Sequence, residues 1–186
     1  MIVSHSINKG APRAVKHGRI GLKLVIALGF ALFSAAAQPA LAQNSADDIV
    51  LTVSGGPDAN GQPVAATYTL AQLQALPKTS FDTSTMWTDG MQSFEGVDLK
   101  TFLDILNVDS GTLSATAIND YRIEMPLTEI SLGGPMIAYS LNGETMSVRD
   151  KGPLWIVYPY DSAPEYQSEV VFSRSIWQLN RIEILP

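Results

Sequence analysis

The chain of 186 residues carries 12 Lys and Arg against 18 Asp and Glu, has no cysteine, and has only two histidines. Both histidines, His5 and His17, fall within the first 42 residues, so the rest of the chain offers neither imidazole nor thiolate. Zinc or copper sites built on these ligands, and Cys or Ser nucleophiles activated by histidine, are therefore excluded there.

Residues 1–42 have the order of a secretory signal peptide. A basic front without acidic residues precedes an apolar run at Leu24–Ala37 and a small-residue cleavage pattern at Ala40-Leu41-Ala42. The alternative is an uncleaved membrane anchor, but the apolar run is short for a membrane span. We therefore expect cleavage after Ala42, a periplasmic location, no membrane insertion after cleavage, and a single domain over residues 43–186.

Cleavage would leave this domain strongly acidic. Five of the 12 basic residues lie in the predicted signal, so seven remain against 18 acidic ones, a net charge near −11. Nucleic acid and anionic membrane surfaces carry the same sign of charge, which argues against both as partners.

The first half of the domain contains both predicted helices. Thr69 can cap a short helix that ends near Pro77, and Asp98–Leu106 places leucines and a phenylalanine on one helical face. The remaining elements of this half are extended: strands at Ile49–Ser54 and Ala65–Tyr68, and a polar extended run at Ser80–Trp87.

The second half is predicted to be mostly strands. Asn142-Gly143 between two such runs is a strong hairpin signal, as is the turn at Asn119-Asp120. The expected strands are Leu113–Ala117, Tyr121–Met125, Pro135–Leu141, Glu144–Val148, a buried Leu154–Tyr158 and Ser175–Leu185. Two short helices among many strands indicate a β-rich α+β fold.

Trp87 and Asp89 form the first candidate site. A tryptophan followed closely by a carboxylate can stack on a flat ring while the carboxylate accepts hydrogen bonds from the ring edge. The alternative is a tryptophan that packs on the core and an aspartate that caps a turn.

The second half offers further candidates. Tyr158 and Tyr160 lie at a predicted strand end before an acidic loop, where ligand contact and core packing are equally plausible, whereas Trp155 fits the core. Arg174 suits either an anion clamp or a surface ion pair. The residue preferences of a hairpin turn are enough to explain Tyr121 without a functional role.

Five stretches together resemble the molybdopterin-binding oxidoreductase domain of the sulfite oxidase family. They are FEGVDLKTFLDIL, AINDYRIEMPL, MIAYSLNGETM, DKGPLWIVYP and SIWQLNRIEI, which follow the order of that family over most of Ser80–Pro186. The resemblance implies an α+β fold with layered, mixed β-sheets. Catalytic members bind molybdenum through a cysteine placed shortly before the position of Trp87, where this chain has threonine and serine. A hydroxyl does not ionise near pH 7 and cannot replace the soft thiolate, so no molybdenum and no sulfite oxidation by the usual route are expected.

The chain is also similar to small, exported, cysteine-free members that act as pterin sensors. That resemblance implies a ligand that is a reduced pterin or molybdopterin-like. It also implies a partner, the periplasmic region of a membrane-bound cyclic-di-GMP enzyme, a diguanylate cyclase/phosphodiesterase. The residues that it places around the pterin are Thr83, Thr85, Trp87, Asp89, Tyr121, Tyr158, Tyr160, Arg174 and Trp177.

Two other functions remain open at this point. The chain could be an oxidoreductase subunit that retains molybdopterin through contacts other than a thiolate. It could also be a structural or interaction domain whose pocket has collapsed, in which case the aromatic residues are core.

Overall fold

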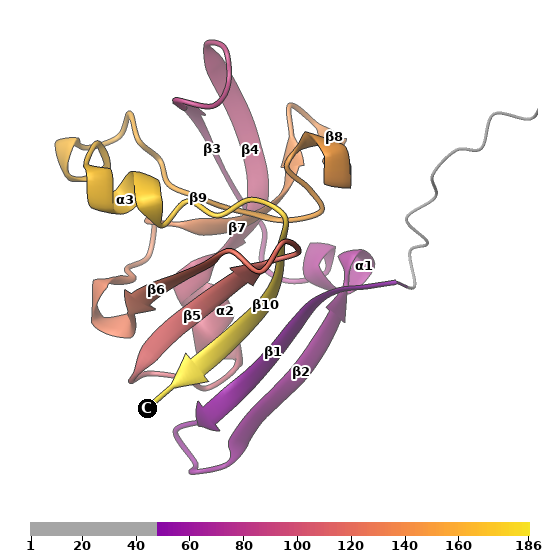
Figure 1. Cartoon of the computed structure of the whole chain (residues 1–186), viewed down its shortest axis with the longest axis vertical. Coiled ribbons are helices and arrows are strands. Elements are labelled where there is room, and N and C mark those ends of the chain that lie inside the picture. The colour runs from indigo at the N-terminus through magenta and orange to yellow at the C-terminus, as the bar shows by residue number, and fades with distance from the viewer. Residues whose placement is uncertain (1–47) are drawn as a thin grey trace, which may run out of the picture. The chain divides into compact units, whose positions relative to one another are not determined.

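The strands form two five-stranded sheets in the computed structural model, which describes residues 48–186 (Figure 1). The predicted signal peptide, residues 1–42, lies outside the described residues. Among the residues described, no helix is long and apolar enough to cross a membrane.

The first sheet has the strand order β2-β1-β10-β5-β6. Its β1 and β10 pair in parallel, and its other pairs are antiparallel. The strands are β1 (Ile49–Pro57), β2 (Pro63–Thr69), β5 (Thr112–Ala117), β6 (Arg122–Pro126) and β10 (Leu179–Leu185).

The second sheet has the order β3-β4-β7-β8, and β9 also pairs with β7. All of its pairs are antiparallel. The strands are β3 (Thr79–Ser84), β4 (Met91–Asp98), β7 (Met136–Leu141), β8 (Glu144–Thr145) and β9 (Trp155–Val157). Two sheets with few short helices confirm the predicted β-rich α+β class with layered, mixed sheets.

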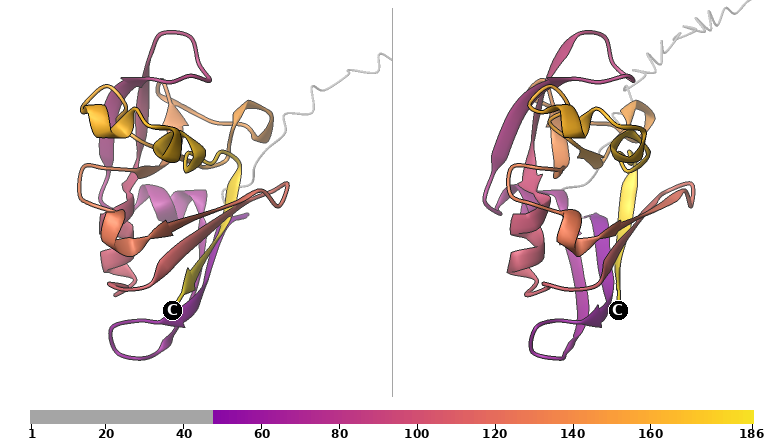
Figure 2. Two further views of the ribbon diagram at one scale, coloured as in Figure 1. Left: turned by 60° about the vertical axis from the view of Figure 1, so that its left-hand side comes forward. Right: turned by 90° about the vertical axis from the view of Figure 1, so that its left-hand side faces the viewer.

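Both predicted helices are present, and Thr69 caps the first of them as predicted. In α1 (Leu70–Gln74), Thr69 Oγ1 accepts the backbone N–H of Gln72 while Gln72 Oε1 accepts that of Thr69, a capping box. Asp98 caps α2 (Leu99–Ile105), which lies on one side of the first sheet (Figure 2). A second oxygen of Asp98 accepts the N–H of Gly133 at 2.8 Å, which joins the helix start to a loop.

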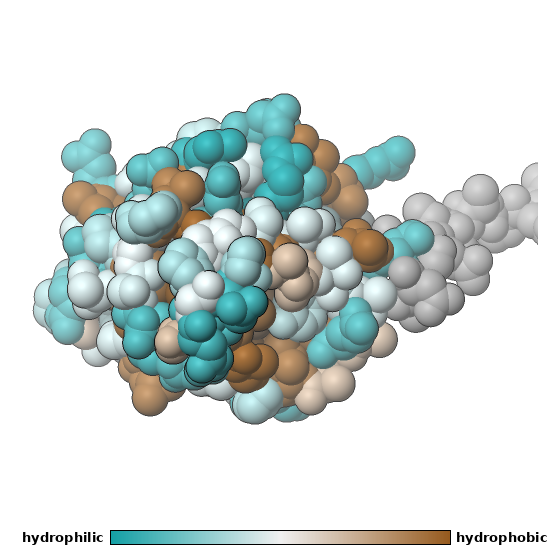
Figure 3. Space-filling model, turned by 90° about the horizontal axis from the view of Figure 1, so that it is seen from below, coloured by the Kyte–Doolittle hydropathy of each residue, from teal (hydrophilic) through white to brown (hydrophobic). Residues whose placement is uncertain are grey.

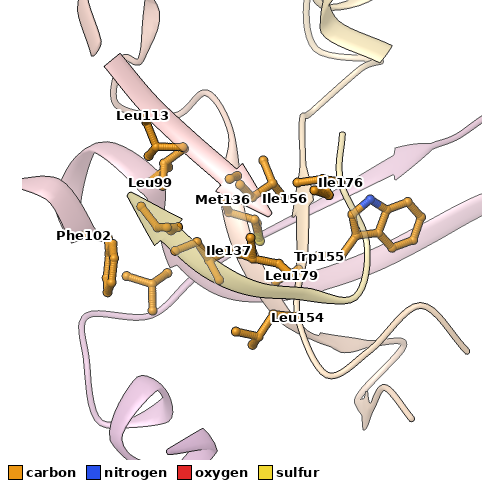
Figure 4. Close-up of a cluster of buried hydrophobic side chains, with 14 of the residues drawn as sticks. Leu99, Phe102, Leu113, Met136, Ile137, Leu154, Trp155, Ile156, Ile176 and Leu179 are labelled. Carbon is orange, nitrogen blue, oxygen red and sulfur yellow. The ribbon is translucent and has the colours of Figure 1, made fainter. Parts of the chain in front are cut away.

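The core is one continuous cluster of buried side chains contributed by both sheets and α2. Trp155 is fully buried, as predicted, and lies at one end of the cluster beside Ile176 (Figure 4). At the end of the molecule seen in Figure 3, hydrophilic and hydrophobic residues are interspersed over the surface. The ring of Trp155 contacts those of Trp87 and Trp177, so it joins the core to the cavities described below.

The predicted bounds of several strands were wrong. The extended run predicted to reach Trp87 ends at Ser84, and the following segment turns back as the unpredicted strand β4. The strand predicted at Glu144–Val148 stops at Thr145. The final strand begins at Leu179 instead of Ser175, because Gln178 adopts a positive φ of 54° and Ile176 accepts the N–H of Ile156 in β9.

A third α-helix, α3 (Glu169–Ser173), was also missed. Ser168 caps it by accepting the N–H of Val171 at 3.4 Å. Three short 3-10 helices complete the described elements: η1 (Leu127–Glu129), η2 (Val148–Asp150) and η3 (Pro164–Tyr166).

Candidate functional site

An apolar cavity of about 750 Å³ lies where the β3–β4 turn, the β5–β6 turn and α3 meet. This size is within the range of small-molecule sites. We call it the aromatic cavity. Its lining consists of Met86, Trp87, Ala117, Asn119, Tyr121, Glu169, Phe172, Ser173, Ser175, Ile176 and Trp177.

Trp87 is the centre of the aromatic wall. Its ring meets Trp155, Tyr160, Phe172 and Trp177 edge to face, with centroid distances of 5.6–6.2 Å. Edge-to-face contact is a favoured arrangement of aromatic pairs. With neighbours from separate segments, the indole is held in place before any ligand arrives.

Hydrogen bonds of threonine hydroxyls form a turn that orients Trp87 toward the aromatic cavity. Thr85 Oγ1 accepts the backbone N–H of Trp87 at 3.1 Å and lies 2.7 Å from Thr88 Oγ1. Such side-chain bonds to the backbone define a local turn. The polar residues before and after Trp87 therefore serve to turn the chain so that the indole faces inward.

The rim of the aromatic cavity carries large side chains that are open to solvent. Tyr121 is 52% exposed, Met86 is 66% exposed and Trp177 is 36% exposed. Asn119 Oδ1 accepts the N–H of Tyr121 at 3.1 Å, and Asp120 has a positive φ of 64°, which together project Tyr121 from the hairpin turn. Gathered exposed apolar groups of this kind mark binding surfaces.

A second, polar cavity of about 410 Å³ shares Met86 and Phe172 with the first. The rest of its lining is Ser84, Thr85, Tyr160, Asp161 and Gln167. Asp161 accepts hydrogen bonds from both the backbone N–H and the hydroxyl of Ser84. The N–H bond, followed by the hydroxyl bond, lowers the pKa of the Asp161 carboxyl below its usual value, so this group is charged at neutral pH.

Two of the predicted site residues lie behind the cavities, in the interior. Thr83 is fully buried and its Oγ1 accepts the backbone N–H of Asp161 at 3.1 Å, so it braces the polar cavity without lining it. Tyr158 is buried as well, and its hydroxyl donates to the sulfur of Met125 at 3.0 Å. Burial raises the pKa of Tyr158 to about 12, against a partly opposing effect of the Arg174 guanidinium.

Two others lie outside both cavities. Asp89 is exposed in the β3–β4 turn. Arg174 pairs with Glu129, with an Nη1–Oε2 distance of 2.6 Å, which is the surface ion pair considered from the sequence. Neither residue lines either cavity.

The structure therefore divides the nine predicted residues. It brings Trp87, Tyr121 and Trp177 together in the aromatic cavity, and Thr85 and Tyr160 in the polar one. Tyr160 is buried beside Ser175, whose hydroxyl it meets, and burial raises its pKa above the usual value.

Sequence reasoning missed the carboxylates that the cavities do contain, Glu169 and Asp161, and the shared wall residues Met86 and Phe172. One signal was available. Ser168 can cap a helix, and Glu169 and Phe172 are three residues apart, which places them on the same face of such a helix.

The residues present do not fit molybdopterin, the cofactor implied by the resemblance to the sulfite oxidase family. Within residues 48–186, neither cavity is lined by Lys or Arg that could hold its phosphate. Among the hydroxyls that stand where the family has its cysteine, that of Thr83 is buried and already bonded. The described part of the chain also has no cluster of three or more His, Cys, Asp or Glu residues suited to a metal ion.

The chain matches no protein-family model and no curated protein sequence. Among solved structures, it is similar to the sulfane dehydrogenase SoxCD from Paracoccus pantotrophus, with a TM-score of 0.55 and 18% sequence identity. The similarity covers 77% of this chain but only 39% of that one. It shows a distant relationship of fold to a sulfite oxidase-like protein, and the activity of that longer enzyme does not follow from it.

Proposed function

We propose that this domain is a periplasmic pterin-binding sensor that carries out no turnover. The observation that carries the proposal is the convergence of Trp87, Trp177 and Tyr121 on a cavity of about 750 Å³. Aromatic rings that are fixed by their neighbours offer faces and edges to a flat heterocycle at little cost in conformational entropy.

The polar groups of the cavity suit the edge of a pterin ring. A pterin presents a 2-amino group and a ring N–H side by side, and a carboxylate accepts two such donors in parallel. Glu169 is the carboxylate in the lining, and Asn119, Ser173 and Ser175 supply further donors and acceptors. Glu169 thus takes the role that the sequence suggested for Asp89.

The alternative of a domain with a collapsed pocket predicts aromatic residues packed without space between them, whereas a cavity remains beside Trp87. The alternative of an oxidoreductase subunit that holds molybdopterin without a thiolate would need a cation for the cofactor's phosphate, and the described linings contain no Lys or Arg. No observation favours either alternative over the sensor.

The signalling part of the proposal rests on the export pattern of residues 1–42 and on the resemblance to cysteine-free sensors. In this proposal the partner is the periplasmic region of a membrane-bound diguanylate cyclase/phosphodiesterase. Ligand in the aromatic cavity would contact the exposed rim residues Met86, Tyr121 and Trp177. It would thereby change the surface that such a partner meets.

The test is to export the protein in its native host, purify it gently, and identify any bound molecule by fluorescence and mass spectrometry together with a molybdenum assay. The expected result is a pterin without molybdenum. Stoichiometric molybdenum would establish the oxidoreductase alternative instead. Failure of the purified protein to bind any added reduced pterin, even at millimolar concentration, would refute the proposal.

A further inference from the structure

The outer face of the first sheet, opposite α2, carries exposed charges. Successive residues of a strand point to opposite faces of the sheet. Ile182 of β10 belongs to the core, so its neighbours Arg181 and Glu183 point to the outer face. Arg122 and Glu124 of β6 lie on the same face, and all four residues are exposed. No other element of the described residues covers this face (Figure 2).

The strand register sorts these charges by sign. In the order β2-β1-β10-β5-β6, one row across the sheet is Thr67, Thr52, Arg181, Thr116 and Arg122, and the next is Ala65, Ser54, Glu183, Ser114 and Glu124. The first row has two cations and the second has two anions, with small side chains at the other positions. The rows are two residues apart along the strands, which is about 7 Å.

This pattern is complementary to a second copy of itself. A two-fold axis that lies parallel to the face and runs across the strands, between the rows, places each row of one copy over the opposite row of the other. Arg181 then faces Glu183 of the other copy, Arg122 faces Glu124 of the other copy, and both contacts recur by symmetry. The strands of the two sheets stay aligned, which is one of the usual ways in which sheets pack face to face.

The charged groups are available for such contacts. Among residues 48–186, Arg122, Glu124 and Glu183 make no ion pair. Arg181 pairs with Asp120, with an Nη2–Oδ1 distance of 2.5 Å, but both side chains are exposed, and a guanidinium with five donors can bind a second carboxylate. Pairs between two sheets would be partly shielded from water and therefore stronger than exposed pairs within one chain.

The size of the face suits a reversible dimer. A sheet of five strands is about 24 Å wide, and strands of about six residues are about 20 Å long. Two copies would therefore bury roughly 1,000 Å² together, at the low end of specific interfaces. An interface of this size depends strongly on its charge pairs.

The net charge of the domain does not prevent this association. The chain has more acidic than basic residues, so two copies repel each other at long range. At physiological ionic strength this repulsion is screened beyond about 8 Å, whereas charges that face one another across the interface lie closer than that.

We propose that the protein forms a two-fold dimer through the outer face of the first sheet, with the arginine row of each copy on the glutamate row of the other. The dimer is independent of the proposed pterin-binding function, because its face does not include the lining of either cavity.

Sedimentation equilibrium of the exported protein over micromolar to millimolar concentrations is the first test. We expect a monomer–dimer equilibrium at physiological salt. In 1 M salt, where charges are screened beyond about 3 Å, the dimer should dissociate at least tenfold more readily. A protein that stays monomeric at millimolar concentration, or a dimer that is insensitive to salt, would overturn the proposal.

Charge-reversal variants identify the interface. In Glu124→Lys/Glu183→Lys both rows carry only cations, and in Arg122→Glu/Arg181→Glu both carry only anions. Each variant should self-associate at least tenfold more weakly than the unmodified protein, because like charges then face one another. An equimolar mixture of the two variants should form dimers again, since cations of one copy then face anions of the other. Both variants remain acidic overall, so a general attraction between them does not explain such recovery.

The matched control is Glu144→Lys/Glu165→Lys, which changes the net charge equally at exposed positions outside the face and should dimerise like the unmodified protein. Dimers that persist in both charge-reversal variants, or a mixture that stays monomeric, would contradict the proposed interface. If a double variant fails to fold, the single substitutions Arg122→Glu and Glu124→Lys in the edge strand β6 replace it. Unchanged self-association of both folded single variants overturns the proposal as well.

Discussion

At the scale of single residues, the aromatic side chains of the cavity differ in how much of the fold depends on them. Trp87 packs against four other rings and is half-buried, whereas Trp177 sits at the rim with 36% of its surface exposed. Replacing Trp87 would therefore disturb both stability and binding. Substitution of Trp177 should separate the effect on binding from the effect on stability.

We predict that Trp177→Ala weakens reduced pterin binding by at least tenfold while lowering the free energy of unfolding by about 2 kcal/mol, less than Trp87→Ala, because its ring packs on Trp87 and Trp155 but remains 36% exposed. Trp87→Ala should cost about 3 kcal/mol in addition to its effect on binding. Calorimetric titration and urea melts measure the two quantities. Loss of stability without loss of affinity in Trp177→Ala would favour a purely structural role for the rim.

The buried tyrosines predict how stability depends on alkaline pH. Tyrosine in an unfolded chain ionises near pH 10, whereas burial raises the pKa of folded Tyr158 to about 12. Because the folded state holds the proton more tightly, the contribution of Tyr158 is complete below pH 10 and is lost as the pH rises toward 12. The shift corresponds to roughly 2–3 kcal/mol.

Urea melts between pH 8 and pH 12 measure this effect. Tyr158→Phe should have a flatter dependence of unfolding free energy on pH than the unmodified protein. Tyr121→Phe, which alters an exposed tyrosine, serves as the control and should retain the original slope. Equal slopes in all three proteins would contradict the assignment to Tyr158.

At the scale of elements, close strand packing requires glycine at Gly96. A Cβ atom there would lie 2.2 Å from the carbonyl oxygen of Ile137 in β7, at the irregularity where the β4–β7 register shifts. Gly96→Ala should therefore lower the free energy of unfolding by about 2–3 kcal/mol, since the obstructing atoms belong to the backbone. Ser80→Ala at an exposed position of β3 is the control for urea melts. If Gly96→Ala left the free energy of unfolding unchanged, β4 and β7 would be able to separate locally without cost.

Elements that are specified by local chemistry were predictable from the sequence. Thr69 caps its helix as expected, and the turns at Asn119-Asp120 and Asn142-Gly143 join paired strands. Elements that depend on distant contacts were not. Strand β4 is defined by pairing with β3 and β7, and the segment before β10 is diverted by bonds to β9, neither of which a linear pattern contains.

The same distinction holds for the site. Residue type identified Trp87 as a ring-binding candidate, the resemblance to pterin sensors added Tyr121 and Trp177, and the fold brings the three together. The carboxylate could not be chosen by type, because Asp89, Asp161 and Glu169 are chemically alike and only the folded chain shows which of them line a cavity. Position in three dimensions, which the sequence does not encode locally, decided between them.

At the scale of the whole molecule, the proposed sensor must couple ligand binding to partner binding. Linkage makes this coupling reciprocal: if pterin raises the affinity for the partner by some factor, the partner raises the affinity for pterin by the same factor. Substitution of the rim residue Met86 tests whether the coupling between ligand binding and partner binding arises at the rim. Met91 is a matched control, because it is 63% exposed, like Met86 at 66%, but lines neither cavity.

We predict that a reduced pterin changes the affinity of the domain for the periplasmic region of the membrane cyclic-di-GMP enzyme by about 5- to 150-fold, the usual range of such couplings. Met86→Ala should reduce this factor several-fold, since it removes a side chain that both cavity and surface share, whereas Met91→Ala should leave it unchanged. Titrations of partner with and without ligand, and of ligand with and without partner, must return the same factor. If neither molecule changes the affinity for the other, the domain binds its ligand without signalling through this surface. A ligand with equal affinity for the free domain and for the complex cannot shift the equilibrium between the two.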